Sequence, residues 1–440
     1  MASAVDWNND GWIDIAIGNN FFENDGTGNF EKRDDINVSC FGTVWGDVDN
    51  DGYMDFFAAR GSGNDKIYYG NEDGSFTEET DPVVVKDYPT VAPMWLDFDK
   101  DGDLDLFIAY GRTSSGGNET YYPDQLYENT GNREFKNITG VSGVGEPEAN
   151  QARDCWGASL CDYNNDGWTD IFVATYRLAP DFLFKNNGDG TFENVADENG
   201  TEGVDTYNPN YFGHGMGSDW GDYDNDGDYD LAVGNLSHWD ERALSSNKSL
   251  IMENTQNGQE FIDRTNEMNL RFKEMNGGIA WVDLNNDSWL DLVHGQISYT
   301  GINDINSDYA LKPSRYYINQ GPDQNYYMKD MSWYFGGEIH GAWSPVPLDY
   351  DNDGDMDLLM CSSLENVKLF RNDIKDKGNY VQIQLIGSDN GKVNQSAYGT
   401  EVEVKTANNT YKKYLPGSRL TGRAAQAPNV MHFGLGNEQK

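Results

Sequence analysis

A nine-residue pattern, Asp-x-(Asp/Asn)-x-Asp-(Gly)-x-x-Asp, occurs seven times and constrains the fold of this chain more than any other feature. Side-chain oxygens at positions 1, 3 and 5 suit a hard cation with many ligands, and glycine at position 6 permits a sharp turn with positive φ. Such segments can also be plain Asp/Asn/Gly turns, but seven copies with one internal spacing favour a metal loop. The copies cover residues 6–14, 47–55, 97–105, 162–170, 222–230, 283–291 and 349–357.

The spacing of the oxygen ligands resembles a shortened calcium loop of the EF-hand type. Magnesium is disfavoured because it prefers rigid octahedral geometry, and zinc because the loops contain neither His nor Cys. We expect up to seven structural Ca²⁺ ions, each held by positions 1, 3, 5 and 9 and by the backbone carbonyl of position 7. The predicted ligands are Asp6, Asn8, Asp10, Trp12, Asp14; Asp47, Asp49, Asp51, Tyr53, Asp55; Asp97, Asp99, Asp101, Asp103, Asp105; Asp162, Asn164, Asp166, Trp168, Asp170; Asp222, Asp224, Asp226, Asp228, Asp230; Asp283, Asn285, Asp287, Trp289, Asp291; and Asp349, Asp351, Asp353, Asp355, Asp357.

The sixth loop differs from the others at position 6, where Ser288 replaces glycine. A serine in the left-handed region costs on the order of 1 kcal/mol. We therefore predict that site six binds its cation most weakly.

The loops start 41 to 66 residues apart, and each is followed by a short apolar run such as residues 105–110, typical of a buried strand. A second apolar stretch precedes each loop, and Asn-Gly or Asp-Gly hairpins follow, as in residues 183–195. One repeat is thus predicted to be four strands, A to D, with the metal loop between A and B. Units of this kind favour an all-β, seven-bladed β-propeller over a solenoid, whose repeats are shorter.

The repeats resemble FG-GAP/VCBS repeats, as in the integrin α-subunit propeller. Residues 377–440 resemble an ASPIC/UnbV domain in the stretches YVQIQLIG (380–387), SAYGTEVEVKT (396–406) and LPGSRLTGRAAQAPNVMHFGLG (415–436). The chain as a whole is similar to the cartilage acidic protein-like family. The resemblance implies a propeller over residues 1–376 and a small β domain over residues 377–440, which we expect to be truncated because the family pattern continues beyond HFGLG.

Charge supports the same boundary. Residues 377–440 contain eight Lys/Arg and four Asp/Glu, a net of +4, so the remaining chain carries −47 of the overall −43. This acidity disfavours nucleic acid and anionic membranes as partners, and no apolar run reaches the length of a membrane span. It is also consistent with simple solubility in salt. Because calcium loops of this kind fill best at millimolar calcium, we expect an extracellular or cell-surface protein.

Function is expected on the face opposite the metal loops, where the B–C and D–A connections vary in length. The resemblance agrees, since integrin propellers bind partners on that face. These connections contain aromatic residues suited to sugar stacking or protein contacts, although such residues can also pack loops together. The predicted ligand-binding residues are Tyr121, Tyr122, Tyr207, Tyr211, Trp239, Tyr299, Trp333 and Tyr334.

The predicted function is a binding or adhesion module for glycan or protein at the cell surface or in the matrix. An enzyme is an alternative, although no catalytic motif is present. His214 and His340 precede strand A of blades five and seven, and Arg153 and Asp154 hold a comparable position in blade four. Together they could form a lyase-like site at the channel mouth. A purely structural component of a surface assembly is the third possibility.

Overall fold

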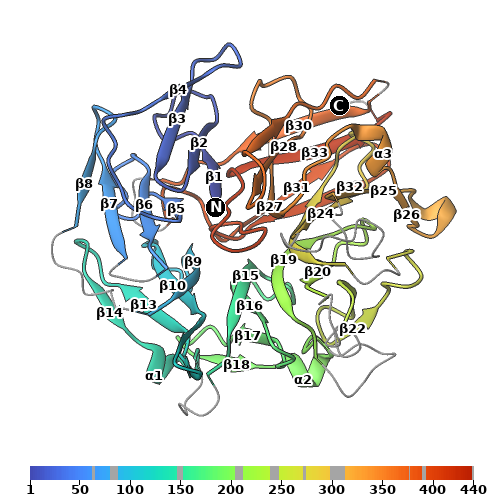
Figure 1. The fold of residues 1–440 in the computed structure, drawn as a ribbon. Helices are drawn as coiled ribbons and strands as arrows, with labels where there is room; N and C mark the ends of the chain where they lie inside the picture. Colours follow the sequence, from blue (N-terminus) through green and yellow to red (C-terminus); the bar gives the residue numbers. More distant parts are fainter. Residues whose placement is uncertain are drawn as a thin grey trace.

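The computed structural model describes residues 1–61, 65–79, 88–145, 152–203, 212–237, 247–270, 274–297, 313–375, 377–388 and 393–438. Seven sheets surround a central axis as the blades of a propeller (Figure 1). The predicted all-β, seven-bladed propeller is therefore confirmed. The strands of blades 1 to 3 are β1 (Ala2–Val5), β2 (Asp14–Ile17), β3 (Asn20–Asn24), β4 (Phe30–Lys32); β5 (Gly42–Gly46), β6 (Asp55–Ala59), β7 (Lys66–Gly70), β8 (Phe76–Glu78); and β9 (Thr90–Leu96), β10 (Asp105–Tyr110), β13 (Gln125–Asn129), β14 (Phe135–Asn137).

Blade 3 also carries a projecting hairpin of β11 (Arg112–Ser115) and β12 (Asn118–Tyr121). Short helices α1 (Thr139–Ser142), α2 (Ala196–Asn199) and α3 (Ser332–Phe335) follow the fourth strands of blades 3, 4 and 6. The strands of blades 4 to 7 are β15 (Cys155–Cys161), β16 (Asp170–Thr175), β17 (Phe182–Asn186), β18 (Phe192–Asn194); β19 (Gly215–Gly221), β20 (Asp230–Asn235), β21 (Leu250–Thr255), β22 (Glu260–Asp263); β23 (Asn276–Val282), β24 (Asp291–Gln296), β25 (Arg315–Asn319), β26 (Met328–Asp330); and β27 (Ala342–Leu348), β28 (Asp357–Ser362), β29 (Lys368–Phe370).

The Asp-rich loop of every blade joins its first and second strands, as predicted. Position 9 of each loop begins the second strand and pairs with the last residue of the first, as in Val5↔Asp14 and Leu96↔Asp105. All seven loops consequently lie at one end of the channel. The expectation of four strands per repeat fails in blade 7, whose described sheet has three. After Asn372 the chain runs through DIKDKG, which lacks the Asn-Gly or Asp-Gly hairpin turn that was predicted after the third strand.

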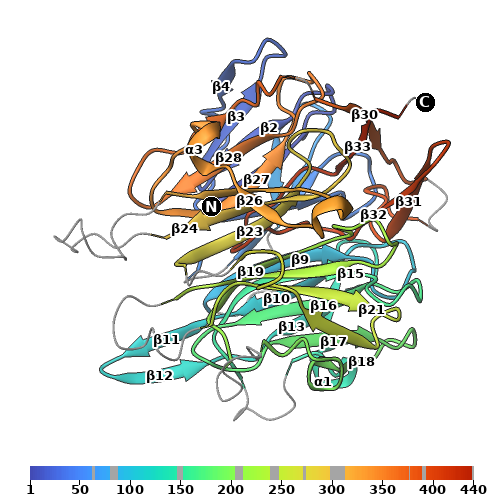
Figure 2. The ribbon, with the colours of Figure 1, turned by 90° about the vertical axis from the view of Figure 1, so that its right-hand side faces the viewer.

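Residues beyond 376 form two small sheets that lie on the end of the propeller where the loops gather (Figure 2). One pairs β30 (Asn379–Gln384) with β33 (Val430–Gly436), and the other pairs β31 (Thr400–Lys405) with β32 (Thr410–Leu415). We call residues 377–438 the C-terminal cap. Although the cap has its own sheets, hydrogen bonds from it reach most blades.

Residues 416–428 of the cap, here called the plug, enter the central channel and bond to the innermost strands. Gln426 forms a parallel bridge with Ser3 of β1, and its Oε1 accepts the Trp45 backbone N–H at 2.7 Å. Thr421 accepts the backbone N–H of Ile279 at 3.0 Å, and Ser418 Oγ accepts that of Trp95 at 3.1 Å. The plug therefore satisfies inward-facing backbone groups that a hollow channel would leave to solvent.

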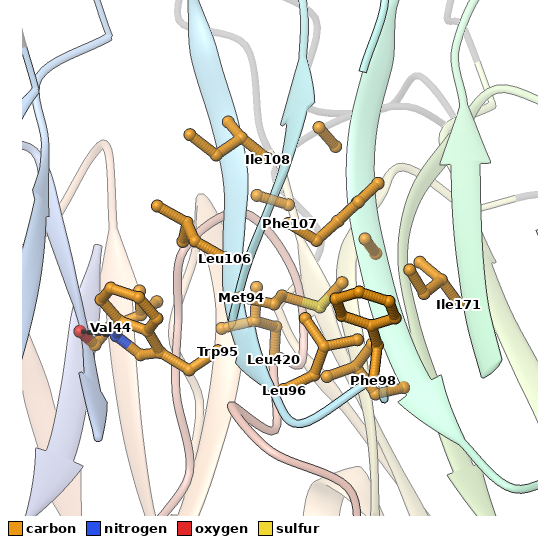
Figure 3. Packing of buried hydrophobic residues seen from close by; sticks show 14 of the residues in the cluster. Val44, Met94, Trp95, Leu96, Phe98, Leu106, Phe107, Ile108, Ile171 and Leu420 are labelled. Atoms are coloured by element: carbon orange, nitrogen blue, oxygen red, sulfur yellow. Dashed lines mark hydrogen bonds between the residues drawn. The ribbon is translucent and has the colours of Figure 1, made fainter. Parts of the chain in front are cut away.

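The core is formed by apolar layers between neighbouring blades. Trp45, Trp95 and Trp281, at equivalent places in blades 2, 3 and 6, are the largest fully buried side chains. Figure 3 shows Leu420 of the plug beside Met94 and Leu96 of β9, so the plug is part of this core. None of the described helices has the length and apolar character to cross a membrane. The four cysteines are free thiols.

Candidate metal centre

The Asp-rich loops share one backbone conformation. In loop 2, the position 1 carboxylate of Asp47 accepts the backbone N–H of Asp51 at 3.1 Å and of Gly52 at 2.8 Å. The same two bonds form in every loop except loop 3. They fold the loop around its position 1 side chain, so that the carboxylates of later positions turn back toward it.

The position 9 aspartate ties the loop to the third strand of its blade. Asp55 accepts the backbone N–H of Val48 through Oδ2 and of Gly70 through Oδ1, both at 2.7 Å. Burial raises the pKa of Asp55 to about 8, and Asp14 and Asp357 are shifted to about 8 for the same first cause. A folded chain without a cation would therefore hold protons in these loops at neutral pH.

The structure brings carboxylates of four loops together as triads whose ligand atoms lie within 4.8 Å of one another. These four loops are the ones with aspartate at position 3. In the remaining three, position 3 is asparagine, and in loop 1 Asn8 Oδ1 accepts the Asp10 N–H at 3.0 Å. The triads are Asp47, Asp49, Asp55; Asp97, Asp99, Asp101; Asp222, Asp224, Asp230; and Asp349, Asp351, Asp353.

The donor set fits a hard cation. Four buried carboxylate oxygens in these loops lack a hydrogen-bond donor within the described part of the chain: Asp49 Oδ1, Asp97 Oδ1, Asp170 Oδ2 and Asp351 Oδ1. Buried polar atoms are almost always paired, so unpartnered anionic oxygens facing other carboxylates indicate a missing positive charge. An oxygen-only set of this kind suits Ca²⁺.

Loop 6 keeps the common conformation despite its substitution. Ser288 has φ 81°, slightly below the 87–96° of its glycine counterparts, and its N–H still bonds to Asp283 Oδ2 at 2.9 Å. The residue is therefore held in the left-handed region with a side chain attached, as the sequence predicted. The weaker affinity expected for this site remains a prediction.

Two sets of asparagines that the sequence reading missed link each loop to the next blade. In six blades an asparagine lies at the end of the third strand or within two residues of it, and its Nδ2 donates to the position 2 carbonyl of the preceding loop. Asn186 Nδ2, for example, donates to Phe98 O of loop 3 at 2.8 Å. In the sequence, these residues are visible as an asparagine that recurs at or near the end of the third predicted strand of each of these six repeats. The six residues are Asn24, Asn129, Asn186, Asn254, Asn319 and Asn372.

A second set lies at position 4 of the loops, again in the left-handed region. In five loops its side-chain amide donates to the position 6 carbonyl of the following loop, as from Asn50 to Gly102 at 3.0 Å. Asn165 of loop 4 donates instead to Asp228 Oδ1 at 3.1 Å, and loop 3 has Lys100 at this position, so Asn186 of the first set makes the link there. Asn352 of loop 7 donates to Gly11 of loop 1 at 3.0 Å, which closes the circle. The Asp-rich loops thus form a hydrogen-bonded ring.

The C-terminal cap contacts this ring directly. Gln382 donates to Asp349 Oδ2 at 2.7 Å, and Asn394 donates to Asp97 Oδ2 at 3.2 Å. Lys377 pairs with Asp355, and His432 Nε2 lies 2.6 Å from Asn286 Oδ1. The cap therefore meets the acidic ring through neutral hydrogen bonds and the ion pair of Lys377 with Asp355.

A family model described as an FG-GAP-like repeat matches residues 6–58, 47–108, 97–173 and 162–233, which together span more than half of the chain. The chain belongs to the FG-GAP-like repeat family. Cartilage acidic protein 1 of Xenopus tropicalis is a distant homologue, 24% identical over 280 residues that make up 62% of this chain and 39% of that protein. The chain thus matches well under two thirds of this relative's length.

Two solved structures show a remote likeness to this FG-GAP-like propeller. An Agrocybe aegerita lectin, described as recognising non-reducing terminal N-acetylglucosamine, has a TM-score of 0.46 at 14% identity, covering 81% of this chain and 88% of that one. The Photorhabdus luminescens Tc holotoxin pore has a TM-score of 0.34 at 16% identity, covering 67% and 13%. Below a TM-score of 0.5, no shared ligand follows.

The structure describes four of the eight residues predicted to bind a ligand. Trp333 and Tyr334 of α3 are 78% and 81% exposed. Tyr121 and Tyr122 are half-buried, and Tyr122 packs on Tyr88 at 4.3 Å between ring centroids, as in the packing alternative. The other four lie outside the described residues: Tyr207, Tyr211, Trp239 and Tyr299.

The four residues of the alternative catalytic site have separate described partners in the FG-GAP-like propeller. His214 is buried and its Nδ1 accepts the backbone N–H of Arg177 at 3.0 Å. His340 Nδ1 lies 2.9 Å from Glu365. The Arg153 guanidinium lies over the Phe182 ring at 3.8 Å, and Asp154 accepts from Arg112 Nε at 2.8 Å. Each contact is explained by packing or ion pairing within the fold.

Proposed function

We propose that each of the seven loops binds one Ca²⁺ through positions 1, 3, 5 and 9 and the position 7 carbonyl. The unpartnered buried oxygens of Asp49, Asp97, Asp170 and Asp351 support this proposal, because a bound cation would satisfy them. The ions would then act as structural elements of the ring. Calorimetric titration of chelator-treated protein should give up to seven sites, with site six the weakest, whereas seven equivalent sites would contradict the ranking.

We further propose that the protein is an extracellular binding or adhesion module for glycan or protein, acting through the face opposite the loops. The observation that supports this choice is the C-terminal cap, which covers the loop end and leaves the other end as the available face. The exposed Trp333 and Tyr334 follow a fourth strand, whose end points toward that face. Adjacent exposed aromatics are well suited to stacking on sugars or to anchoring a protein.

The test is a glycan and matrix-protein array probed in calcium buffer with the full chain, with Trp333→Ala combined with Tyr334→Ala, and with Tyr327→Ala as control. Tyr327 is 37% exposed and follows the third strand, which runs toward the loop end. We expect the double variant to lose signals that the control retains. Equal signals from both would contradict the assignment of this face.

The same array separates the other two classes predicted from the sequence. Product formation that disappears in His214→Ala or His340→Ala would favour the enzyme, and self-association without any sugar or protein signal would favour a structural component. We also propose that residues 377–440 are an ASPIC/UnbV-type domain, on the stretches YVQIQLIG and HFGLG.

A further inference from the structure

The plug carries one arginine through the channel to the face opposite the Asp-rich loops. The Arg423 guanidinium carbon lies 4.8 Å from the centre of the Phe41 ring and 5.3 Å from that of Trp156. Phe41 immediately precedes β5, and Trp156 is the second residue of β15. Both residues therefore lie at the starts of innermost strands, and the Asp-rich loops lie at the opposite ends of these strands. The C-terminal cap thus contributes a cation to a surface on the other side of the molecule.

Arg423 has no ion pair or hydrogen bond among the described residues, and its Nε is buried without a partner. The carboxylate of Asp154, whose charge acts on Arg423, is already bonded to Arg112 Nε at 2.8 Å and to Trp156 Nε1 at 3.0 Å. The other plug arginine, Arg419, is paired with Asp219 at 2.7 Å. A guanidinium offers five donors in a planar fork, so an unpaired one at a channel mouth has donors available for a carboxylate.

Aromatic rings line the same mouth. Trp156 stacks on Trp343 with 6.2 Å between centroids and 10° between planes, and Tyr176 lies 5.4 Å from Trp156. All three are half-buried, so each presents some ring surface. Flat aromatic faces beside a planar cation suit a pyranose ring that carries a carboxylate, because the ring can stack while the carboxylate pairs with the guanidinium.

The other charged groups beside this mouth form ion pairs with one another. Arg112 and Arg177 both pair with Glu119, and Arg112 also pairs with Asp154. Asp124 and Asp181 lie at the same strand ends, 3.5 Å from Cys155 Sγ and 2.7 Å from the Thr175 backbone nitrogen. A carboxylate ligand would meet in Arg423 a guanidinium that no described carboxylate pairs with.

We propose that the channel mouth binds a carboxylate-bearing sugar, such as a uronic acid unit of a polysaccharide, with Arg423 pairing its carboxylate and Trp156 and Trp343 stacking on its ring. The proposal rests on the glycan-binding function proposed above and specifies the substrate class. It also makes the C-terminal cap part of the binding site.

The test is calorimetric titration of the full chain in calcium buffer with an oligogalacturonate and with a neutral oligosaccharide of equal length. We expect the acidic probe to bind at least about tenfold more tightly, and Arg423→Gln to remove that preference. Arg423→Lys should retain part of it, because the charge remains and the bidentate geometry is lost. The matched control is Arg371→Gln, an exposed arginine paired with Asp373 on the surface, which should leave affinity unchanged.

Because Arg423→Gln could disturb the plug, Trp343→Leu tests the same site from the propeller side and should also weaken the acidic probe. Unchanged affinity in both variants overturns the proposal. Binding of neutral but not acidic probes overturns it while leaving the proposed glycan function standing, and binding of neither probe counts against both. Tighter binding of an acidic peptide than of the oligogalacturonate would overturn the assignment of a sugar.

Discussion

The ring of asparagine amides predicts that substituting two adjacent asparagines, Asn186 and Asn187, will lower the free energy of unfolding by very different amounts. Asn186 is 1% exposed, and its Nδ2 donates to Phe98 O at 2.8 Å and Thr169 O at 3.3 Å, while its Oδ1 accepts the Gly188 N–H at 2.9 Å. Asn187 is exposed, and its Nδ2 contacts only Thr191 Oγ1 within its own hairpin, at 3.1 Å. Only the first residue joins two blades.

Asn186→Ala leaves two buried carbonyls and one half-buried N–H without their partner. At about 1 kcal/mol for each bond, the free energy of unfolding should fall by about 3 kcal/mol. Asn187→Ala removes one solvent-exposed bond, so its effect should stay below about 1 kcal/mol. Asn186→Asp should be worse than alanine, because a carboxylate would face two carbonyl oxygens.

The assay is urea unfolding in excess calcium, followed by tryptophan fluorescence, with the slope on urea compared between variants. The reasoning is refuted if Asn186→Ala and Asn187→Ala differ by less than about 1 kcal/mol at equal slope. In that case the bonds between loops would be a consequence of packing and would not stabilise the ring.

Three further predictions concern titration and the metal loops. In chelator, Asp14, Asp55 and Asp357 have a pKa of about 8 in the folded chain, against about 3.9 in the unfolded chain. The melting temperature should therefore fall as the pH rises from 4 through 8. Excess calcium should abolish this dependence of the melting temperature on pH. Ser288→Gly should relieve its positive φ and raise stability by about 1 kcal/mol, together with the calcium affinity of loop 6 in titration. Burial, and secondarily Lys413, lowers the pKa of His432 to about 3. The neutral imidazole therefore stabilises the fold fully above pH 6.5, its ordinary pKa, and less as the pH falls below that value. In urea unfolding, the destabilisation caused by His432→Asn should be about 2 kcal/mol smaller at pH 5 than at pH 7.

The repeat made the blade count and the place of the metal loops predictable. A nine-residue spacing fixes local geometry, and Val5↔Asp14 and its equivalents follow from it. Asn186 and its equivalents were visible as a repeated letter, but their partners lie on other blades, and only the closed ring shows which carbonyls they reach. The path of the plug could not be predicted, because the contact of Arg423 with Phe41 joins residues far apart in sequence. Charge predicted a boundary near residue 376, but the contacts between the cap and the acidic ring are mostly neutral hydrogen bonds, with Lys377–Asp355 as an ion pair beside them.

Closure of the propeller follows from these contacts. Blade 1 and blade 7 are each built from one continuous stretch of chain, so the described strands of one do not complete the sheet of the other. Beside the apolar cluster that the two blades share, three polar links join them: Asn24 Nδ2 to Tyr350 O at 2.8 Å, Asn352 Nδ2 to Gly11 O at 3.0 Å, and the plug, which bonds to Ser3 through Gln426 and to Pro345 through Thr421. Two of these three links run through the metal loops and the third through the cap that covers them. If the loops hold cations as proposed, then cation binding, cap docking and ring closure stabilise one another, and loss of any one of them should open the ring first between blades 7 and 1.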